Sequence, residues 1–132
     1  CVQHIRLYGI SMEPTLHAGE IRFVNKLAYR QKPPQRGDIV AARFKDSDRV
    51  LLLKRVIARP GETVAIRNGV VWIDGVGLDE PYLHPDRDPW QVREVQMGPT
   101  EYFLIGDNRS MGPERHAFGI VDRSQIIGKL IE

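Results

Sequence analysis

The sequence predicts a mainly β fold, an antiparallel coiled sheet or barrel, in a single domain over residues 1–132. Apolar residues recur in short runs, turn signals separate these runs, and helical periodicity is hardly present. The chain is long enough to bury a core without covalent staples, and 42% of its residues are hydrophobic. Its single cysteine, Cys1, excludes an internal disulfide.

The expected strands follow one another from the N-terminus. Residues 2–8 are rich in β-formers and end at Gly9, and residues 21–25 alternate apolar and polar side chains. Asn68-Gly69 is the clearest hairpin turn, because both of its positions require positive φ. Further turns are expected at 36–38, 46–48 and 74–75. The other expected strands cover residues 39–44, 50–57, 63–66, 70–73, 102–105 and 126–131.

Residues 76–100 differ from this pattern. They hold four of the nine prolines, several acidic residues and His84. Proline cannot donate to a sheet ladder, so the segment is expected to be a surface insertion, either a long loop or a small subdomain.

Charge and composition narrow the function classes. Nineteen Lys and Arg against seventeen Asp and Glu give a net charge of +2, which does not indicate a nucleic-acid binder. Residues 1–66 are basic and residues 67–132 are acidic, a gradient compatible with an anionic membrane surface. No His or Cys cluster has metal-ligand spacing and no glycine-rich phosphate loop is present, so neither a metal nor a cofactor is expected.

No apolar run approaches the roughly 18 residues that a spanning helix needs. Because the chain begins with Cys1 rather than methionine, we expect it to be part of a longer protein.

Ser11 is the first candidate for chemistry. It follows a predicted strand and lies between Gly9 and Pro14, on a sharp change of backbone direction. A turn serine that bonds its own backbone is the alternative reading. A Ser-His-Asp triad of Ser11, Asp107 and His116 has no local motif to support it.

Lys54 is the second candidate, because it lies in the most apolar predicted strand. Both faces of residues 50–57 are largely apolar, so at least one of Lys54 and Arg55 is expected near the core. Burial lowers the pKa of a lysine and makes the neutral amine available as a general base. The alternative is that Lys54 reaches the strand edge or pairs with a carboxylate.

Four segments in order carry a family resemblance: Ser-Met-Glu-Pro-Thr-Leu at 11–16, Arg-Gly-Asp-Ile-Val at 36–40, Lys-Arg-Val-Ile-Ala-Arg-Pro-Gly at 54–61 and Gly-Asp-Asn-Arg at 106–109. Together they resemble the boxes of bacterial type I signal peptidases, over nearly the whole chain. The resemblance implies a Ser/Lys serine endopeptidase that removes signal peptides from exported preproteins after small residues of Ala-X-Ala type. It also implies a coiled-sheet core, a small insertion at 76–100, a membrane phospholipid surface as partner, and a catalytic domain on the extracytoplasmic side of the cell membrane. The anchor is expected upstream of Cys1.

The resemblance assigns roles to individual residues. Ser11 resembles the nucleophile and Lys54 the general base, and the Ser11 N–H resembles one oxyanion donor. Gly9 occupies the position at which some members supply a second donor. The positions that resemble the pocket for residues −1 and −3 are Ile5, Leu7, Met12, Leu16 and Leu53. Those that resemble supporting residues are Asp107, Asn108, Arg109, Ser110 and Gly112.

The last box departs from the family pattern. Gly112 stands where a serine commonly orients the lysine, and Glu114 and His116 replace an acid–arginine pair. Ser110 or a water is then the expected source of the missing hydrogen bond to Lys54.

Two other functions fit parts of the sequence. Self-cleaving repressors of the SOS response are also Ser/Lys proteases, but they lack the Gly-Asp-Asn-Arg box and cleave an Ala-Gly bond upstream of the serine. The only such bond here, Ala18-Gly19, lies downstream of it. A non-catalytic β-barrel binding module is the second alternative.

Overall fold

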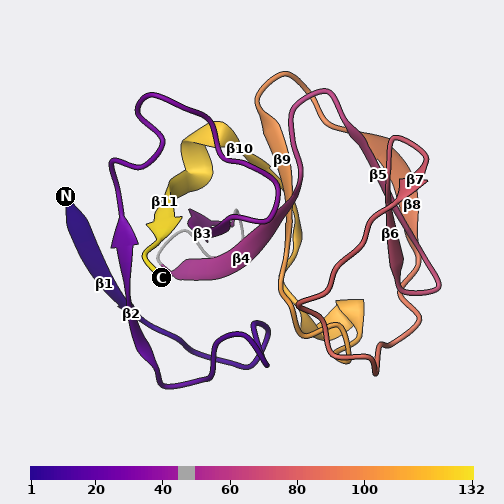
Figure 1. Ribbon diagram of the computed structural model, residues 1–132, viewed down its shortest axis with the longest axis horizontal. Coiled ribbons are helices and arrows are strands. Elements are labelled where there is room, and N and C mark those ends of the chain that lie inside the picture. The colour runs from indigo at the N-terminus through magenta and orange to yellow at the C-terminus, as the bar shows by residue number, and fades with distance from the viewer. Residues whose placement is uncertain (45–49) are drawn as a thin grey trace.

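The computed structural model describes residues 1–44 and 50–132. Its strands form two antiparallel sheets, a larger one in the order β1-β2-β11-β3-β4-β9-β10 and a smaller one in the order β7-β6-β5-β8 (Figure 1). The predicted mainly β, antiparallel fold is therefore confirmed. The strands are β1 (Val2–Arg6), β2 (Ile21–Asn25), β3 (Ile39–Arg43), β4 (Leu51–Ala58), β5 (Thr63–Arg67), β6 (Val70–Ile73), β7 (Val76–Gly77), β8 (Val92–Gln96), β9 (Glu101–Ile105), β10 (Gly119–Asp122) and β11 (Ile126–Leu130).

Every strand expected from the described residues is present, and β2 and β6 have the expected bounds. Three strands were not expected: β7, β8 and β10. Each has few consecutive apolar residues, so its extended conformation depends on pairing with a neighbouring strand and leaves no clear pattern in the sequence. The expected turn at 46–48 lies outside the described residues.

The segment 76–100, expected as a surface insertion, is exposed over most of its residues and also joins the smaller sheet. It contributes β7 and β8 to the smaller sheet, on either side of the β5–β6 hairpin. Trp90 and Met97 are almost fully buried in the apolar cluster that joins this sheet to β4 and β9. Burial of such large side chains stabilises the packed segment by roughly 1.5–3 kcal/mol each.

A second apolar cluster positions the loop between β1 and β2. Leu7, Met12 and Leu16 from this loop pack against Leu53 of β4 and Leu130 of β11. Since Met12 and Leu16 are each only 2% exposed, the loop is held against the larger sheet on both sides of its central turn.

Helical structure in the described residues is limited to the 3₁₀ segments η2 (Pro113–Arg115) and η3 (Arg123–Gln125). Within residues 1–44 and 50–132, no helix is long and apolar enough to cross a membrane.

Candidate active site

Ser11 lies on the turn that Met12 and Leu16 fix to the core. The turn is closed by backbone hydrogen bonds from Glu13 to Ile10 and from Leu16 to Met12. Gly9 enters it with a φ of +76°, a conformation that side chains rarely adopt. The Ser11 N–H donates to no atom of the described chain and is free to bind an oxyanion.

Lys54 is brought to Ser11 by the middle of β4. Its Nζ lies 2.6 Å from Ser11 Oγ and donates to it, although the two residues are 43 positions apart in the sequence. The side chain is only 2% exposed. Burial lowers the pKa of Lys54 from 10.5 to about 8, because desolvation penalises the ammonium form. A serine hydroxyl therefore lies against an amine that is partly neutral near physiological pH.

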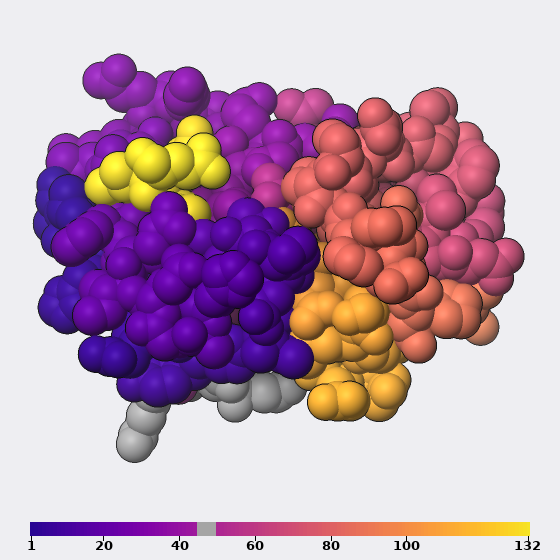
Figure 2. Space-filling model, turned by 60° about the horizontal axis from the view of Figure 1, so that its bottom comes forward, coloured from indigo at the N-terminus to yellow at the C-terminus, as the bar shows by residue number. Residues whose placement is uncertain are grey.

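The loop after β9, residues 106–110, holds the Ser11 segment from the other side. The Asn108 N–H donates to the Ser11 carbonyl at 2.8 Å, and its Nδ2 donates to the Ile10 carbonyl at 3.0 Å. Figure 2 shows the surface along which the indigo N-terminal segment meets the orange segment that follows β9. Asn108 thus holds the peptide units on both sides of Ser11.

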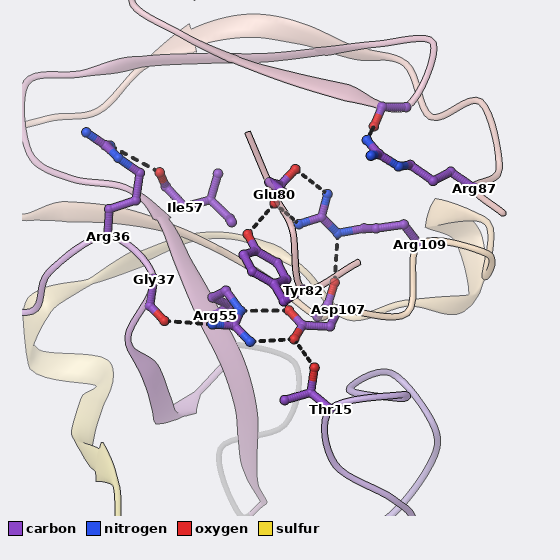
Figure 3. Close-up of polar contacts among 12 residues, drawn as sticks. Thr15, Arg36, Gly37, Arg55, Ile57, Glu80, Tyr82, Arg87, Asp107 and Arg109 are labelled. Carbon is purple, nitrogen blue, oxygen red and sulfur yellow. Dashed lines mark hydrogen bonds and ion pairs between the residues drawn. The ribbon is translucent and has the colours of Figure 1, made fainter. Parts of the chain in front are cut away.

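Asp107 ties this loop to the strand that carries Lys54 (Figure 3). Its buried carboxylate accepts hydrogen bonds from Arg55 Nε at 2.9 Å and Arg55 Nη2 at 2.6 Å, and from Thr15 Oγ1 at 2.5 Å. Arg55 also donates to the Gly37 carbonyl at 2.9 Å, and its Cζ lies 3.8 Å from the centre of the Tyr82 ring. The bidentate pair beside Lys54 therefore links five separate segments of the chain.

Arg109 makes a second buried ion pair, also visible in Figure 3. Its Nη2 lies 2.7 Å from Glu80 Oε2 and its Nε donates to the Gly106 carbonyl at 2.8 Å. Tyr82 donates its hydroxyl to the same Glu80 carboxylate. Desolvation raises the pKa of Tyr82, and the Glu80 charge raises it further, so Tyr82 stays a donor.

The candidate Ser-His-Asp triad is wrong. His116 Nε2 accepts from the Gly106 N–H at 2.9 Å, and the Asp107 carboxylate is taken by Arg55 and Thr15. Ser11 Oγ is bonded to Lys54 instead. The three groups do not bond to one another in any order, so they cannot relay a proton.

Ser110 does not support Lys54, contrary to one of our expectations. Its Oγ donates to Asn108 Oδ1 at 2.5 Å. At Gly112, a Cβ atom would lie 2.3 Å from Glu114 Oε1, so the Glu114 carboxylate fills the space of a side chain there. Among the described residues, Ser11 is the only side chain hydrogen-bonded to Lys54.

A small cavity of about 30 Å³ opens beside the Ser11–Lys54 pair. Four of the five expected pocket residues line it: Ile5, Leu7, Met12 and Leu53. Leu16 does not line the cavity; it is buried in the apolar cluster of the β1–β2 loop. A cavity of this size can hold a small group such as a water molecule or a methyl group.

Sequence reasoning gave no site role to Thr15, Arg55, Glu80 and Tyr82. Thr15 and Arg55 lie within two of the four motifs, which is a usable local signal. Glu80 and Tyr82 lie in the Pro-rich segment and acquire their role only through distant contacts. Neither has a local pattern from which the role follows.

Comparison with known proteins finds relatives of one family. Residues 1–131 match the family described as "Signal peptidase, peptidase S26". A signal peptidase I of Bacillus caldolyticus is 35% identical over 92% of this chain and 73% of its own length. A probable signal peptidase I-1 of Synechocystis is 36% identical over 89% of this chain and 63% of its own length. The crystal structure of a signal peptidase I from Enterococcus faecalis V583 superposes with a TM-score of 0.62 at 29% identity, covering 76% of this chain and 98% of that one.

Proposed function

Since this chain belongs to the signal peptidase family, peptidase S26, and is a serine endopeptidase of signal peptides, we propose that Ser11 is its nucleophile and Lys54 its general base. The observation that carries this proposal is the 2.6 Å contact between Ser11 Oγ and the buried Lys54 Nζ. Family membership argues against both the repressor-type protease and the binding module.

The reaction begins when neutral Lys54 takes the Ser11 hydroxyl proton while Oγ bonds to the scissile carbonyl carbon. The Ser11 N–H stabilises the resulting oxyanion. As the intermediate collapses, the C–N bond breaks and Lys54 gives its proton to the leaving amine. Lys54 then takes a proton from the water that attacks the acyl-enzyme carbonyl carbon. As the bond from that carbon to Ser11 Oγ breaks, Lys54 returns the proton to Oγ, which releases the signal peptide and regenerates the Ser11 hydroxyl.

The small cavity supports selection of alanine at position −1 of the substrate. Its volume of about 30 Å³ admits a methyl group, whereas a larger side chain has to displace Met12 or Leu53. Both residues are buried in a packed cluster, so that displacement is costly.

We propose that the chain acts at a phospholipid surface on the extracytoplasmic side of the membrane, where exported preproteins emerge. Exposed apolar side chains next to the site support contact with such a surface. Tyr8 is 78% exposed, Ile10 41% and Val50 45%, and all three adjoin the Ser11 turn or the cavity. Single exposed apolar residues are ordinary, but here they gather around the site. Weak, reversible binding of this chain to lipid vesicles that falls for Tyr8→Ser with Ile10→Ser would support this placement, and unchanged binding would oppose it.

Replacement of each member of the dyad tests the proposed chemistry. Ser11→Ala and Lys54→Ala should each abolish cleavage of a preprotein while circular dichroism and the unfolding midpoint show an intact fold. Exposed Ser124→Ala and Lys26→Ala serve as matched controls and should cleave at the wild-type rate. Near-native cleavage by either dyad variant would refute the assignment.

A further inference from the structure

His116 is a buried titratable residue with no part in the chemistry described above. It is 6% exposed and packs against the rings of Trp90 and Phe118, with centroid distances of 5.2 and 6.3 Å. Its Nε2 accepts from the Gly106 N–H at 2.9 Å, so the neutral ring carries its proton on Nδ1. Burial of a polar ring among aromatic side chains costs free energy. A functional contact made by the ring would account for its presence at this position.

Gly106 connects His116 to the nucleophile. A Cβ at Gly106 would lie 2.3 Å from the Ser11 carbonyl oxygen and 2.6 Å from His116 Nε2, so this glycine is enclosed between the two residues. Two positions further on, Asn108 donates its N–H to the same Ser11 carbonyl. The position of the Gly106–Asn108 backbone therefore fixes the position of the Ser11 backbone, and with it the distance between Ser11 Oγ and Lys54 Nζ.

We infer that His116 is a positioning residue for the nucleophile, acting as a neutral acceptor that anchors the Gly106 N–H and, through Gly106–Asn108, holds Ser11 Oγ against Lys54. This inference rests on the proposed role of Ser11 and Lys54. In this role His116 supports the dyad in a chain that has Gly112 where family members commonly have a serine. The nearby Ser110 does not provide that support, because it donates to Asn108.

The surroundings of His116 keep it in the acceptor form. Desolvation by burial, together with the charges of Lys54 and Arg109, lowers the pKa of His116 from 6.5 to about 3. These two cations are the charged groups that face it, Lys54 from β4 and Arg109 from the loop after β9. Protonation would remove the acceptor and place a third positive charge among them.

Two variants of His116 separate an acceptor from a space-filling ring. In His116→Gln the amide oxygen can still accept from the Gly106 N–H, whereas His116→Leu fills the space without an acceptor. We expect His116→Gln to keep kcat within about threefold of wild type. We expect His116→Leu to lower kcat by about 10- to 100-fold with KM changed less than threefold, because neither His116 nor Gly106 lines the cavity beside Ser11. Exposed His84→Leu is the matched control and should leave both constants unchanged.

The outcomes distinguish this inference from the function on which it depends. Wild-type kcat in His116→Leu, or a more than tenfold loss in a folded His116→Gln, would overturn the positioning role. The latter result is decisive even when His116→Leu does not fold. Retention of cleavage by Ser11→Ala would instead overturn the proposed dyad.

Discussion

Lys54→Met separates the chemical role of Lys54 from its effect on the fold. Methionine has a similar length, no charge and a flexible side chain that fits irregular buried space. Burial shifts the pKa of Lys54 from 10.5 down to about 8, which corresponds to about 3 kcal/mol. The side chain is 2% exposed, so solvent screens this effect little.

The sign of the pH dependence follows from proton linkage. The folded chain binds the Lys54 proton more weakly than the unfolded chain, so wild-type stability falls as pH drops from 10.5 to about 8 and levels off below that. At pH 7 the buried ammonium therefore costs about 3 kcal/mol, offset by its hydrogen bond to Ser11 at about 1.5–3 kcal/mol. Lys54→Met should be as stable as wild type at pH 7, or slightly more stable.

The measurement is the free energy of unfolding by urea for both proteins at pH 7 and pH 10.5. The stability of Lys54→Met relative to wild type should fall by about 3 kcal/mol between these two values. Exposed Lys26→Met controls for general effects of removing a lysine and should show no such change. An equal difference at both pH values would refute the depressed pKa, and a large loss of stability at pH 7 would make Lys54 a structural partner.

The same titration governs cleavage. With a pKa of about 8, about one tenth of Lys54 is neutral at pH 7 and about nine tenths at pH 9. Cleavage by the wild type should rise roughly ninefold over this range along a single-proton limb, and Lys54→Met should be inactive throughout. A flat profile between pH 7 and 9 would contradict a lysine base with this pKa.

Substrates with Leu in place of Ala at −1 should lose roughly 10- to 100-fold in kcat/KM, since overpacking costs about 1–3 kcal/mol, and Leu53→Ala should recover part of the loss; equal rates for Ala and Leu would exclude this pocket. Glu80→Ala leaves the Arg109 charge buried and unpaired, so the free energy of unfolding measured by urea titration should fall by about 3–5 kcal/mol. A fall of less than about 1 kcal/mol would count against the pair as a stabilising contact. Gly106→Ala should abolish cleavage because its Cβ would lie 2.3 Å from the Ser11 carbonyl, whereas Gly77→Ala meets only ordinary contacts and should retain it; an active Gly106→Ala enzyme would mean that the loop can shift freely. Burial lowers the pKa of His116 from 6.5 to about 3, so the folded chain binds this proton more weakly than the unfolded chain. The free energy of unfolding of wild type should therefore fall relative to that of His116→Gln as pH drops from 6.5 towards 3. Parallel curves of stability against pH for the two proteins would disprove the buried neutral ring.

Local features of the sequence determined the strands and the candidate residues. Alternation of apolar and polar residues identified β2, and the Asn68-Gly69 turn identified the β5–β6 hairpin, because both depend on short-range sterics and side-chain periodicity. An apolar run around one lysine likewise predicted the burial of Lys54, which is a property of its own strand. The four ordered motifs were sufficient to indicate the family.

Contacts between distant segments were decided by the tertiary structure alone. β11 lies between β2 and β3, and β8 completes the smaller sheet, although neither pairing has a signal in the local pattern. The 2.6 Å contact of Ser11 with Lys54, the Glu80–Arg109 pair and the His116–Gly106 hydrogen bond likewise join residues that are 43, 29 and 10 positions apart in the sequence. The physical reason is that a residue type and its neighbours set local conformation and burial, whereas hydrogen-bond geometry across dozens of residues depends on how whole strands pack.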